Sequence, residues 1–269
     1  PYNYTSYSDR EIIIRFLGED SWQIIEQLRG SRRTGRSARM LFEVLGDMWV
    51  IKRNPYVKDD LLNNPKRRDS LIGALKHRLK QVELRVDGNA DAQKLHNSCL
   101  QAVVDFEDSL LLQVSLRQTT IKLLSRITSI NNIDFSGLAR VAHSTDATDW
   151  RIAMPFVVFK PDTEEEVAAI VRACIKLGLT IIPRGGGTGY TGGAIPLHSN
   201  TAIINTEKLE TLSTIKKIEL AGGDGTHAVV ECGAGVITRR VSDLADANGF
   251  AFAVDPTSQD ASTIGGNIS

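Results

Sequence analysis

The chain has 269 residues, of which 42% are hydrophobic and 24% charged, and its formal net charge is zero. These values are typical of a soluble globular protein with room for two domains. They argue against a transmembrane segment, because no apolar run approaches the roughly 20 residues that a span needs. The polar start, residues 1–6, does not resemble a signal peptide. The three cysteines, Cys99, Cys174 and Cys232, are odd in number and far apart, which indicates buried thiols in a reducing compartment and no metal site.

Residues 1–142 are expected to form an α+β domain whose strands come early in the chain. A strand-like run, residues 11–18, ends at a glycine. Two further apolar runs, residues 40–45 and 48–51, flank Gly46-Asp47, a dipeptide that is typical of a two-residue hairpin. No catalytic motif occurs in this domain, so the sequence assigns it no role.

Helices are predicted in the same domain from the spacing of apolar residues. A short helix is expected to end at Gly30, and two long helices are expected over residues 69–85 and 90–130. Apolar residues at this spacing form a stripe along one side of a helix, and such a stripe usually packs in a core or against a partner. His77 and His96 lie in polar helical surroundings and are expected at the surface.

Positive charge is concentrated in the front of the chain. Residues 29–85 hold 15 Lys or Arg against six Asp or Glu, and five arginines form the densest group: Arg29, Arg32, Arg33, Arg36 and Arg39. Such a block occurs in proteins that bind nucleic acid or anionic lipid, and also on solvated faces or surfaces that dock an acidic domain. Aromatic residues are not interleaved with the arginines as a base-stacking platform needs, so no nucleic-acid partner is expected.

Loop residues between 131 and 150 predict the start of a second domain, residues 143–269. Thr163-x-x-Glu166 is a capping box that opens a helix. A short buried strand, residues 180–182, should follow that helix, which makes a β-α-β unit with parallel strands. Farther along, strands are expected at 202–205 and 228–231, and a helix from Ile237 to Gly249.

The most informative stretch follows the strand at 180–182. Residues 185–193 contain six glycines in nine positions. Glycine allows main chain to approach a ligand closely, and successive N–H groups in a turn make a concave site for an anion. The natural anion is a phosphate or diphosphate. Gly233-Ala234-Gly235 could also be a phosphate turn, although a plain strand-to-helix connection is favoured.

Three kinds of nucleotide loop compete for this stretch. A Walker-type loop is excluded, because no lysine occurs between Lys176 and Lys208. The Rossmann fingerprint G-x-G-x-x-G fits residues 187–192 formally, with Glu207 about 20 residues later. That motif requires a helix directly after its last glycines, whereas residues 194–200 contain a proline and no helical period.

The third kind fits best. Arg-Gly-Gly-Gly-Thr-Gly followed by Thr-Gly-Gly resembles the diphosphate loop of the vanillyl-alcohol oxidase/p-cresol methylhydroxylase (PCMH) flavoproteins. Within them it is most similar to the FAD-linked oxidase branch that includes D-lactate dehydrogenase, the glycolate oxidase FAD subunit and D-2-hydroxyglutarate dehydrogenase. Three other stretches, 154–161, 163–179 and 255–267, resemble the same family in the expected order. The resemblance covers residues 143–269 and implies an α+β fold that ends in the first part of a PCMH-type FAD-binding domain.

The resemblance also implies a cofactor and its contacts. The main-chain N–H groups of residues 185–189 would hold the FAD diphosphate. Thr188 stands where some relatives carry the histidine that bonds covalently to flavin, so non-covalent FAD is expected. Arg184 either pairs with phosphate or braces the loop through a carboxylate. The implied cofactor contacts are Arg184, Gly185, Gly186, Gly187, Thr188, Gly189, Gly192, Gly193, Pro256, Thr257, Ser258, Ser262, Gly265, Gly266 and Asn267.

By resemblance, the reaction is oxidation of a 2-hydroxy acid of the D-lactate, glycolate or D-2-hydroxyglutarate class by hydride transfer to flavin. The electron acceptor would be a quinone, a cytochrome or an iron–sulfur module. No residue is assigned as the catalytic base, and His143, His198 and His227 are expected to be structural. Residues 1–142 are similar to the segment that precedes the flavin domain in large bacterial proteins fused to a C-terminal iron–sulfur module.

These similarities predict an N-terminal fragment of such a protein, inactive alone and weak in FAD affinity, with any iron–sulfur cluster in the missing C-terminal part. A cytoplasmic location, or a peripheral one at the inner membrane, is expected. The alternative is a non-catalytic scaffold or partner-binding module whose glycine loop is vestigial.

Overall fold

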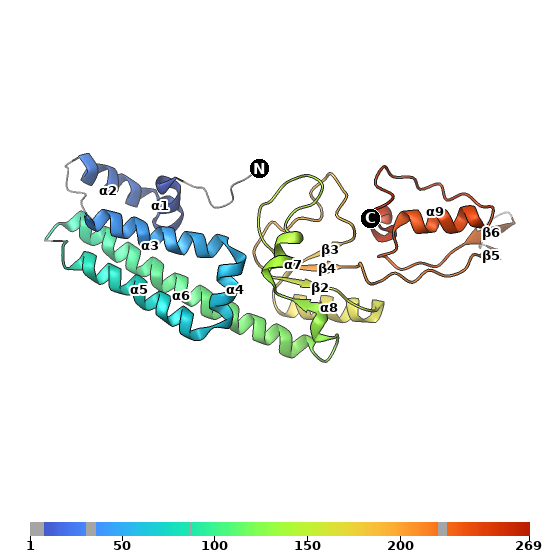
Figure 1. The fold of residues 1–269 in the computed structure, drawn as a ribbon, viewed down its shortest axis with the longest axis horizontal. Coiled ribbons are helices and arrows are strands. Elements are labelled where there is room, and N and C mark those ends of the chain that lie inside the picture. Colours follow the sequence, from blue (N-terminus) through green and yellow to red (C-terminus); the bar gives the residue numbers. More distant parts are fainter. Residues whose placement is uncertain (1–7, 31–35, 87, 220–224) are drawn as a thin grey trace. The chain divides into compact units, whose positions relative to one another are not determined.

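The structure is a computed structural model that describes residues 8–30, 36–86, 88–219 and 225–269. The chain folds into two compact units, residues 1–118 and 119–269 (Figure 1). Each unit has hydrophobic clusters of its own. Arg32 and Arg33 of the basic block lie outside the described residues. Among the residues that are described, no helix combines the length and apolar character that crossing a membrane requires.

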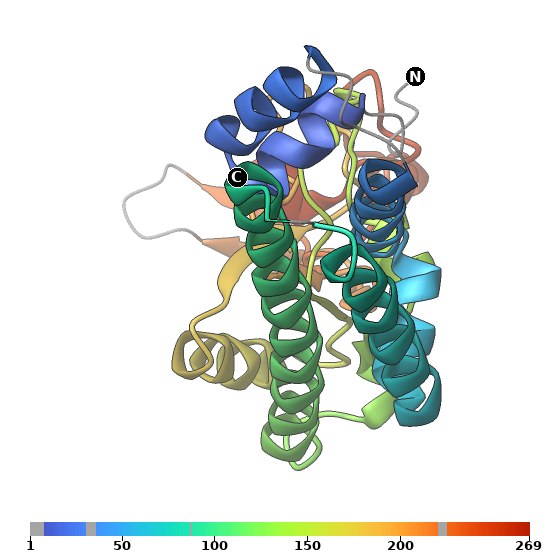
Figure 2. The same ribbon diagram turned by 90° about the vertical axis from the view of Figure 1, so that its left-hand side faces the viewer.

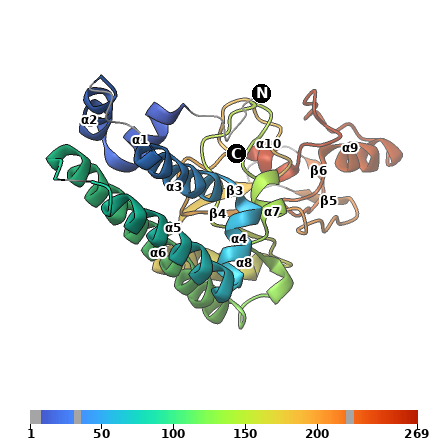
Figure 3. The ribbon, with the colours of Figure 1, turned by 60° about the vertical axis from the view of Figure 1, so that its left-hand side comes forward.

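The first unit is helical throughout its described residues. Its helices are α1 (Asp9–Leu17), α2 (Glu19–Gly30), α3 (Arg36–Arg53), α4 (Pro55–Asn63), α5 (Pro65–Glu83) and α6 (Ala90–Leu124), the last of which continues into the second unit. Helices α5 and α6 lie side by side (Figures 2 and 3) and share one core with α1 to α4. Leu75, Leu79 and Cys99 are almost fully buried in that core.

The strands predicted in this region are wrong. Residues 11–18 belong to α1, where Ser8 accepts a hydrogen bond from the N–H of Glu11 and Gly18 ends the helix with φ 85°. The hairpin predicted around Gly46 is the middle of α3. Val44, Met48 and Ile51 are buried at helical spacing, so the apolar residues on the two sides of Gly46 form one stripe.

Three predicted helices are confirmed as α2, α5 and α6, although the helix predicted over residues 90–130 ends at Leu124. The surface position predicted for His96 is wrong: its side chain is buried, and Nε2 lies 3.1 Å from the carbonyl oxygen of Leu79. This contact joins α6 to α5. His77 is exposed, as expected.

The second unit contains a mixed four-stranded sheet in the order β1-β2-β4-β3. Its strands are β1 (Ile133–Asp134), β2 (Val157–Phe159), β3 (Thr180–Arg184) and β4 (Thr201–Asn205), and its helices include α7 (Gly137–Ala142) and α8 (Glu164–Lys176). Strands β2, β4 and β3 are parallel, and β1 pairs antiparallel with β2. The overall α+β class is therefore confirmed.

The predicted β-α-β unit is β2-α8-β3, and β4 is inserted between its two strands. Strand β3 is half-exposed at the edge of the sheet, so its prediction as a buried strand is wrong. Thr163 caps α8 by accepting a hydrogen bond from the N–H of Glu166, as its capping box predicts.

The rest of the unit is a two-stranded antiparallel sheet with two helices. It comprises β5 (Lys216–Glu219), β6 (Thr226–Val229), α9 (Thr238–Ala247) and the short α10 (Ile264–Ile268). Val236, Val241 and Ile264 form its buried cluster. Gly249 follows α9 with φ 75°, which is consistent with the predicted end of that helix.

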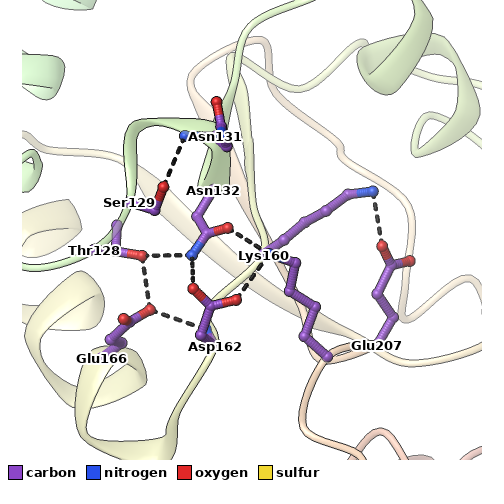
Figure 4. Close-up of polar contacts among 9 residues, drawn as sticks. Thr128, Ser129, Asn131, Asn132, Lys160, Asp162, Glu166 and Glu207 are labelled. Carbon is purple, nitrogen blue, oxygen red and sulfur yellow. Dashed lines mark hydrogen bonds and ion pairs between the residues drawn. The ribbon is translucent and has the colours of Figure 1, made fainter.

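A polar cluster around the buried side chain of Asn132 ties residues 128–132 to the sheet (Figure 4). Asn132 is fully buried; its Nδ2 donates to Thr128 Oγ1 at 2.8 Å and to Asp162 Oδ2 at 2.7 Å. Its Oδ1 accepts from Lys208 Nζ at 2.6 Å. Hydrogen bonds from Lys208 and Asn132 lower the pKa of Asp162. These contacts attach residues 128–132 to the second unit, whereas the domain boundary at 142/143 stays a prediction.

Candidate functional site

The candidate site lies where the parallel strands end. In a parallel sheet the carboxyl ends of the strands meet at one edge, which is the usual place for a ligand. Lys160 follows β2, Arg184 ends β3 and Asn205 ends β4. The glycine loop leaves this edge directly from Arg184.

The loop exposes main-chain donors. Among the described residues, no hydrogen bond uses the N–H groups of residues 185–189. Gly187 and Gly192 have φ of 67° and 72°, conformations that side chains disfavour. Free, closely spaced amides of this kind match the nest that the sequence predicts for an anion.

The loop meets the second predicted contact segment, residues 255–267. A Cβ added to Gly185 would overlap the hydroxyl of Thr263, and one added to Gly186 would overlap the carbonyl oxygen of Ala261. These two glycines are therefore required by close packing of protein against protein. Gly189 differs, because a Cβ there would meet nothing within 4 Å.

A cavity of about 330 Å³ opens between the two segments. Its lining includes Arg184, Gly185, Gly186, Ala261 and Thr263, together with polar groups at the end of β4. Thr263 is 6% exposed, and its hydroxyl has no hydrogen-bond partner among the described residues. A buried hydroxyl without a partner is rare in folded proteins, and an oxygen atom of a ligand in this cavity would satisfy it.

Arg184 braces the loop through main-chain carbonyls. Its Nη1 donates to the carbonyl oxygens of Thr145 at 2.7 Å and Ala194 at 3.4 Å. Burial lowers the pKa of Arg184, and the charge of Asp146 opposes that shift. These contacts brace the loop, with carbonyl oxygens in place of the predicted carboxylate, and the pairing of Arg184 with phosphate stays a prediction.

His143 is a buried structural residue in the wall of the cavity. Its Nδ1 lies 2.7 Å from the carbonyl oxygen of Ala139, so it donates there, and its Nε2 accepts from Asn205 Nδ2 at 2.9 Å. Burial lowers the pKa of His143 and so favours the neutral ring, although the hydrogen bond to Ala139 acts in the opposite direction. Both ring nitrogens are engaged, in agreement with the structural role predicted for this residue. His198 and His227 are exposed and do not line the cavity.

Glu207 is held beside His143 as a carboxylate. Lys160 Nζ lies 2.7 Å from Oε1, and Asn205 Nδ2 donates to Oε2 at 2.9 Å. Burial alone would raise the pKa of Glu207, but these two contacts outweigh it and lower the pKa. The labelled side chains of Lys160 and Glu207 point toward each other in Figure 4.

Several predicted contact residues are bonded within the protein. Asn267 Nδ2 donates to Thr238 Oγ1 at 2.6 Å, and the hydroxyl of Ser262 lies 2.9 Å from the same oxygen. The N–H of Gly265 donates to the carbonyl oxygen of Ala234. Ser258 accepts main-chain hydrogen bonds in a turn with residues 261 and 262. These groups shape the segment, and only part of their polar surface is left for a ligand.

The remaining predicted contacts lie along the loop and the turn. Thr188 and Gly192 are half-exposed, and Gly193, Thr257 and Gly266 flank the same segments. The ring of Trp150 packs against Gly192, where an added Cβ would lie 3.2 Å from it. Thr263 and Trp150 are absent from the predicted contacts, because no sequence pattern shows which hydroxyl stays unpaired or which ring reaches the loop.

Comparison with known proteins bears on this geometry. Residues 155–269 match the FAD binding domain family, and residues 1–108 match a family described as protein of unknown function (DUF3683). The second unit contains an FAD-binding domain. Free amides and the orphan hydroxyl of Thr263 suit the polar, anionic part of FAD.

Curated relatives of the FAD-binding domain are oxidoreductases by name. The chain is 36% identical over 118 residues to D-lactate dehydrogenase of Archaeoglobus fulgidus, covering 44% of this chain and 24% of the relative. It is 30% identical over 145 residues to glycolate oxidase subunit GlcD of Bacillus subtilis, covering 54% and 29%. Rat D-2-hydroxyglutarate dehydrogenase is 29% identical, with 42% and 19% covered. The chain spans a quarter or so of the length of these relatives.

Among solved structures, p-cresol methylhydroxylase with substrate bound is similar to 57% of this chain, with a TM-score of 0.46 and 16% identity, covering 29% of that enzyme. An alkyldihydroxyacetonephosphate synthase is similar to 55% of the chain, with a TM-score of 0.43 and 20% identity, covering 30% of that protein.

Proposed function

We propose that this chain is the FAD-binding part of an oxidoreductase that oxidises a 2-hydroxy acid of the D-lactate, glycolate or D-2-hydroxyglutarate class. The names of the curated relatives support this substrate class. The observation that carries the proposal is the set of main-chain amides at residues 185–189 without hydrogen bonds, in a loop whose Gly185 and Gly186 line one cavity together with Thr263.

In this proposal the loop amides hold the diphosphate of FAD. Each charge-assisted hydrogen bond of this kind contributes about 1.5–3 kcal/mol. The hydroxyl of Thr263 donates to an oxygen of the same cofactor. FAD is held without a covalent bond at Thr188, because a threonine has no ring nitrogen to attach.

When bound, the flavin supplies the two-electron acceptor for hydride from the α-carbon of the hydroxy acid. The described residues supply cofactor binding and a fixed main chain around it. His143 does not act as the base, because both of its ring nitrogens are engaged. We place the base, the substrate contacts and the electron acceptor (a quinone, a cytochrome or an iron–sulfur module) in the part of the relatives' length that this chain does not cover. We propose a location in the cytoplasm or at the periphery of the inner membrane.

The binding step is tested by titrating the chain with FAD and following quenching of flavin fluorescence. Gly189→Leu should weaken binding at least about tenfold, because its side chain enters the space above the loop and meets no protein atom. Gly73→Leu, on the exposed side of α5 with equally open space, is the matched control and should bind FAD as wild type does. Wild-type affinity in Gly189→Leu would contradict the proposed loop.

The substrate class is tested on the flavin-loaded intact protein without oxygen. Bleaching of the flavin absorption by D-lactate, glycolate or D-2-hydroxyglutarate is the expected result. An intact protein that cannot be loaded with FAD would favour the alternative, a scaffold or partner-binding module with a vestigial loop. The helical first unit, which matches a family of unknown function, would be the partner-binding part in that case.

A further inference from the structure

The strap, residues 145–153, follows the glycine loop along its length. The N–H of Ala147 donates to the carbonyl oxygen of Gly187 at 3.1 Å, and the N–H of Ala153 donates to that of Pro196 at 3.2 Å. Between these two bonds, the ring of Trp150 packs against Gly192. The strap therefore contacts the glycine loop at Gly187 and Gly192, and the chain that leaves the loop at Pro196.

One side chain joins the strap, the loop and β3. The guanidinium of Arg184 donates from Nη1 to the carbonyl oxygens of Thr145, in the strap, and Ala194, at the end of the loop. Its plane also lies against Gly187, where an added Cβ would come within 2.8 Å of Cζ. Gly187 has the left-handed φ of 67° at that point.

We propose that Arg184 is a positioning residue for the diphosphate loop: it fixes the strap and the loop end to β3, and so holds the amides of residues 185–189 toward the ligand. The inference rests on the proposed function. Arg184 acts through the loop backbone and needs no direct contact with phosphate. The planar guanidinium fork suits this task, because Nη1 alone serves both carbonyls while the rest of the group, Nη2, Cζ and Nε, covers Gly187.

Two substitutions separate geometry from charge. Arg184→Lys keeps the positive charge and loses the fork, whereas Arg184→Gln loses both. If Arg184 positions the loop, both variants should raise the Kd for FAD by about tenfold or more. If its charge alone attracts the diphosphate, Arg184→Lys would bind as wild type does, and the inference would be overturned.

The matched control is Arg140, another arginine of the second unit. Arg140 is buried and its Nε donates to the carbonyl oxygen of Pro155 at 2.8 Å, before β2. Arg140→Gln should lower the stability of the fold and leave the Kd for FAD unchanged below the melting temperature. An equal rise of Kd in Arg140→Gln would mean that any buried arginine matters, which also overturns the inference.

A readout without FAD keeps the inference separate from the proposed function. Hydrogen exchange at the N–H of Ala147, which reports its bond to Gly187, should be faster in both Arg184 variants and unchanged in Arg140→Gln. Unchanged exchange at Ala147 overturns the inference whether or not the chain binds FAD, whereas faster exchange in a chain that ignores FAD contradicts only the proposed function.

Discussion

Gly186 and Ala261 touch across the two segments of the candidate site, so closely that a Cβ on Gly186 would overlap the carbonyl oxygen of Ala261. This contact gives Gly186 a role in holding the site together that is separate from any role in binding. Replacement of Gly186 by a bulky residue would empty the site in two ways at once, by blocking the ligand and by separating the segments. Different variants are needed to measure the block to the ligand and the separation of the segments.

Gly186→Ala should destabilise the second unit by about 1–3 kcal/mol, because the added methyl group forces the main chain at Ala261 away. Urea unfolding followed by circular dichroism measures this loss. Gly189→Ala is the control and should change stability by less than about 0.5 kcal/mol, since its Cβ meets nothing. Equal stability of the two alanine variants would show that the segments are not in close contact.

Thr263→Val should affect the free and the FAD-bound protein differently. Valine keeps the shape of threonine and removes a buried hydroxyl that has no partner, so the free protein should keep its stability or gain about 1 kcal/mol. FAD affinity should fall by about fivefold or more, because one donor to the cofactor is lost. Thermal melts with and without FAD compare the two states. A loss of stability in the free protein would mean that the hydroxyl already has a partner.

The glycine loop could be predicted because its residue types have a direct chemical meaning. Few roles other than close approach and unusual φ angles explain six glycines in residues 185–193. The helix after Thr163 could be predicted for the same kind of reason, since a capping box has a local cause. Both features depend on a few neighbouring residues, and local sequence is enough to specify them.

The failures come from information that is not local. Residues 11–18 and 40–51 are short apolar runs whose periodicity fits a strand or a helix, and their burial beside α5 and α6 decides for helix. The burial of His96 depends on a carbonyl of another helix. Whether the hydroxyl of Thr263 finds a hydrogen-bond partner depends on which polar groups the fold brings near it. None of these can be read from one segment.

His143 should make stability depend on pH. Its pKa is lowered in the folded protein, so below about pH 6.5 the unfolded chain binds the proton more readily than the folded one. The contribution of His143 is therefore fully present above that pH and is lost as the pH falls through the unfolded value toward the folded one. Urea unfolding between pH 8 and pH 5 should show a shallower decline in His143→Gln than in wild type. Parallel declines would contradict a neutral, buried ring.

Asn132 offers the last test, on the polar cluster that attaches residues 128–132 to the sheet. Asn132→Ala should cost roughly 1–2 kcal/mol in the free energy of unfolding, because Thr128 loses a buried partner, whereas Asp162 and Lys208 are exposed and can be hydrated when Asn132 is absent. Its neighbour Asn131 is the matched control, because Asn131 is exposed and its hydrogen bond in this cluster is made by its main-chain N–H.

Asn131→Ala should therefore change stability by less than about 0.5 kcal/mol. Chemical unfolding monitored by circular dichroism compares the two alanine variants, and hydrogen exchange at Lys160, whose N–H donates to the carbonyl oxygen of Asn132, shows whether the loss is local to this attachment. Equal stabilities would mean that the cluster adds nothing to the attachment. A loss confined to Asn132→Ala, with faster exchange at Lys160, would show that the side chain of Asn132 holds this segment to β2.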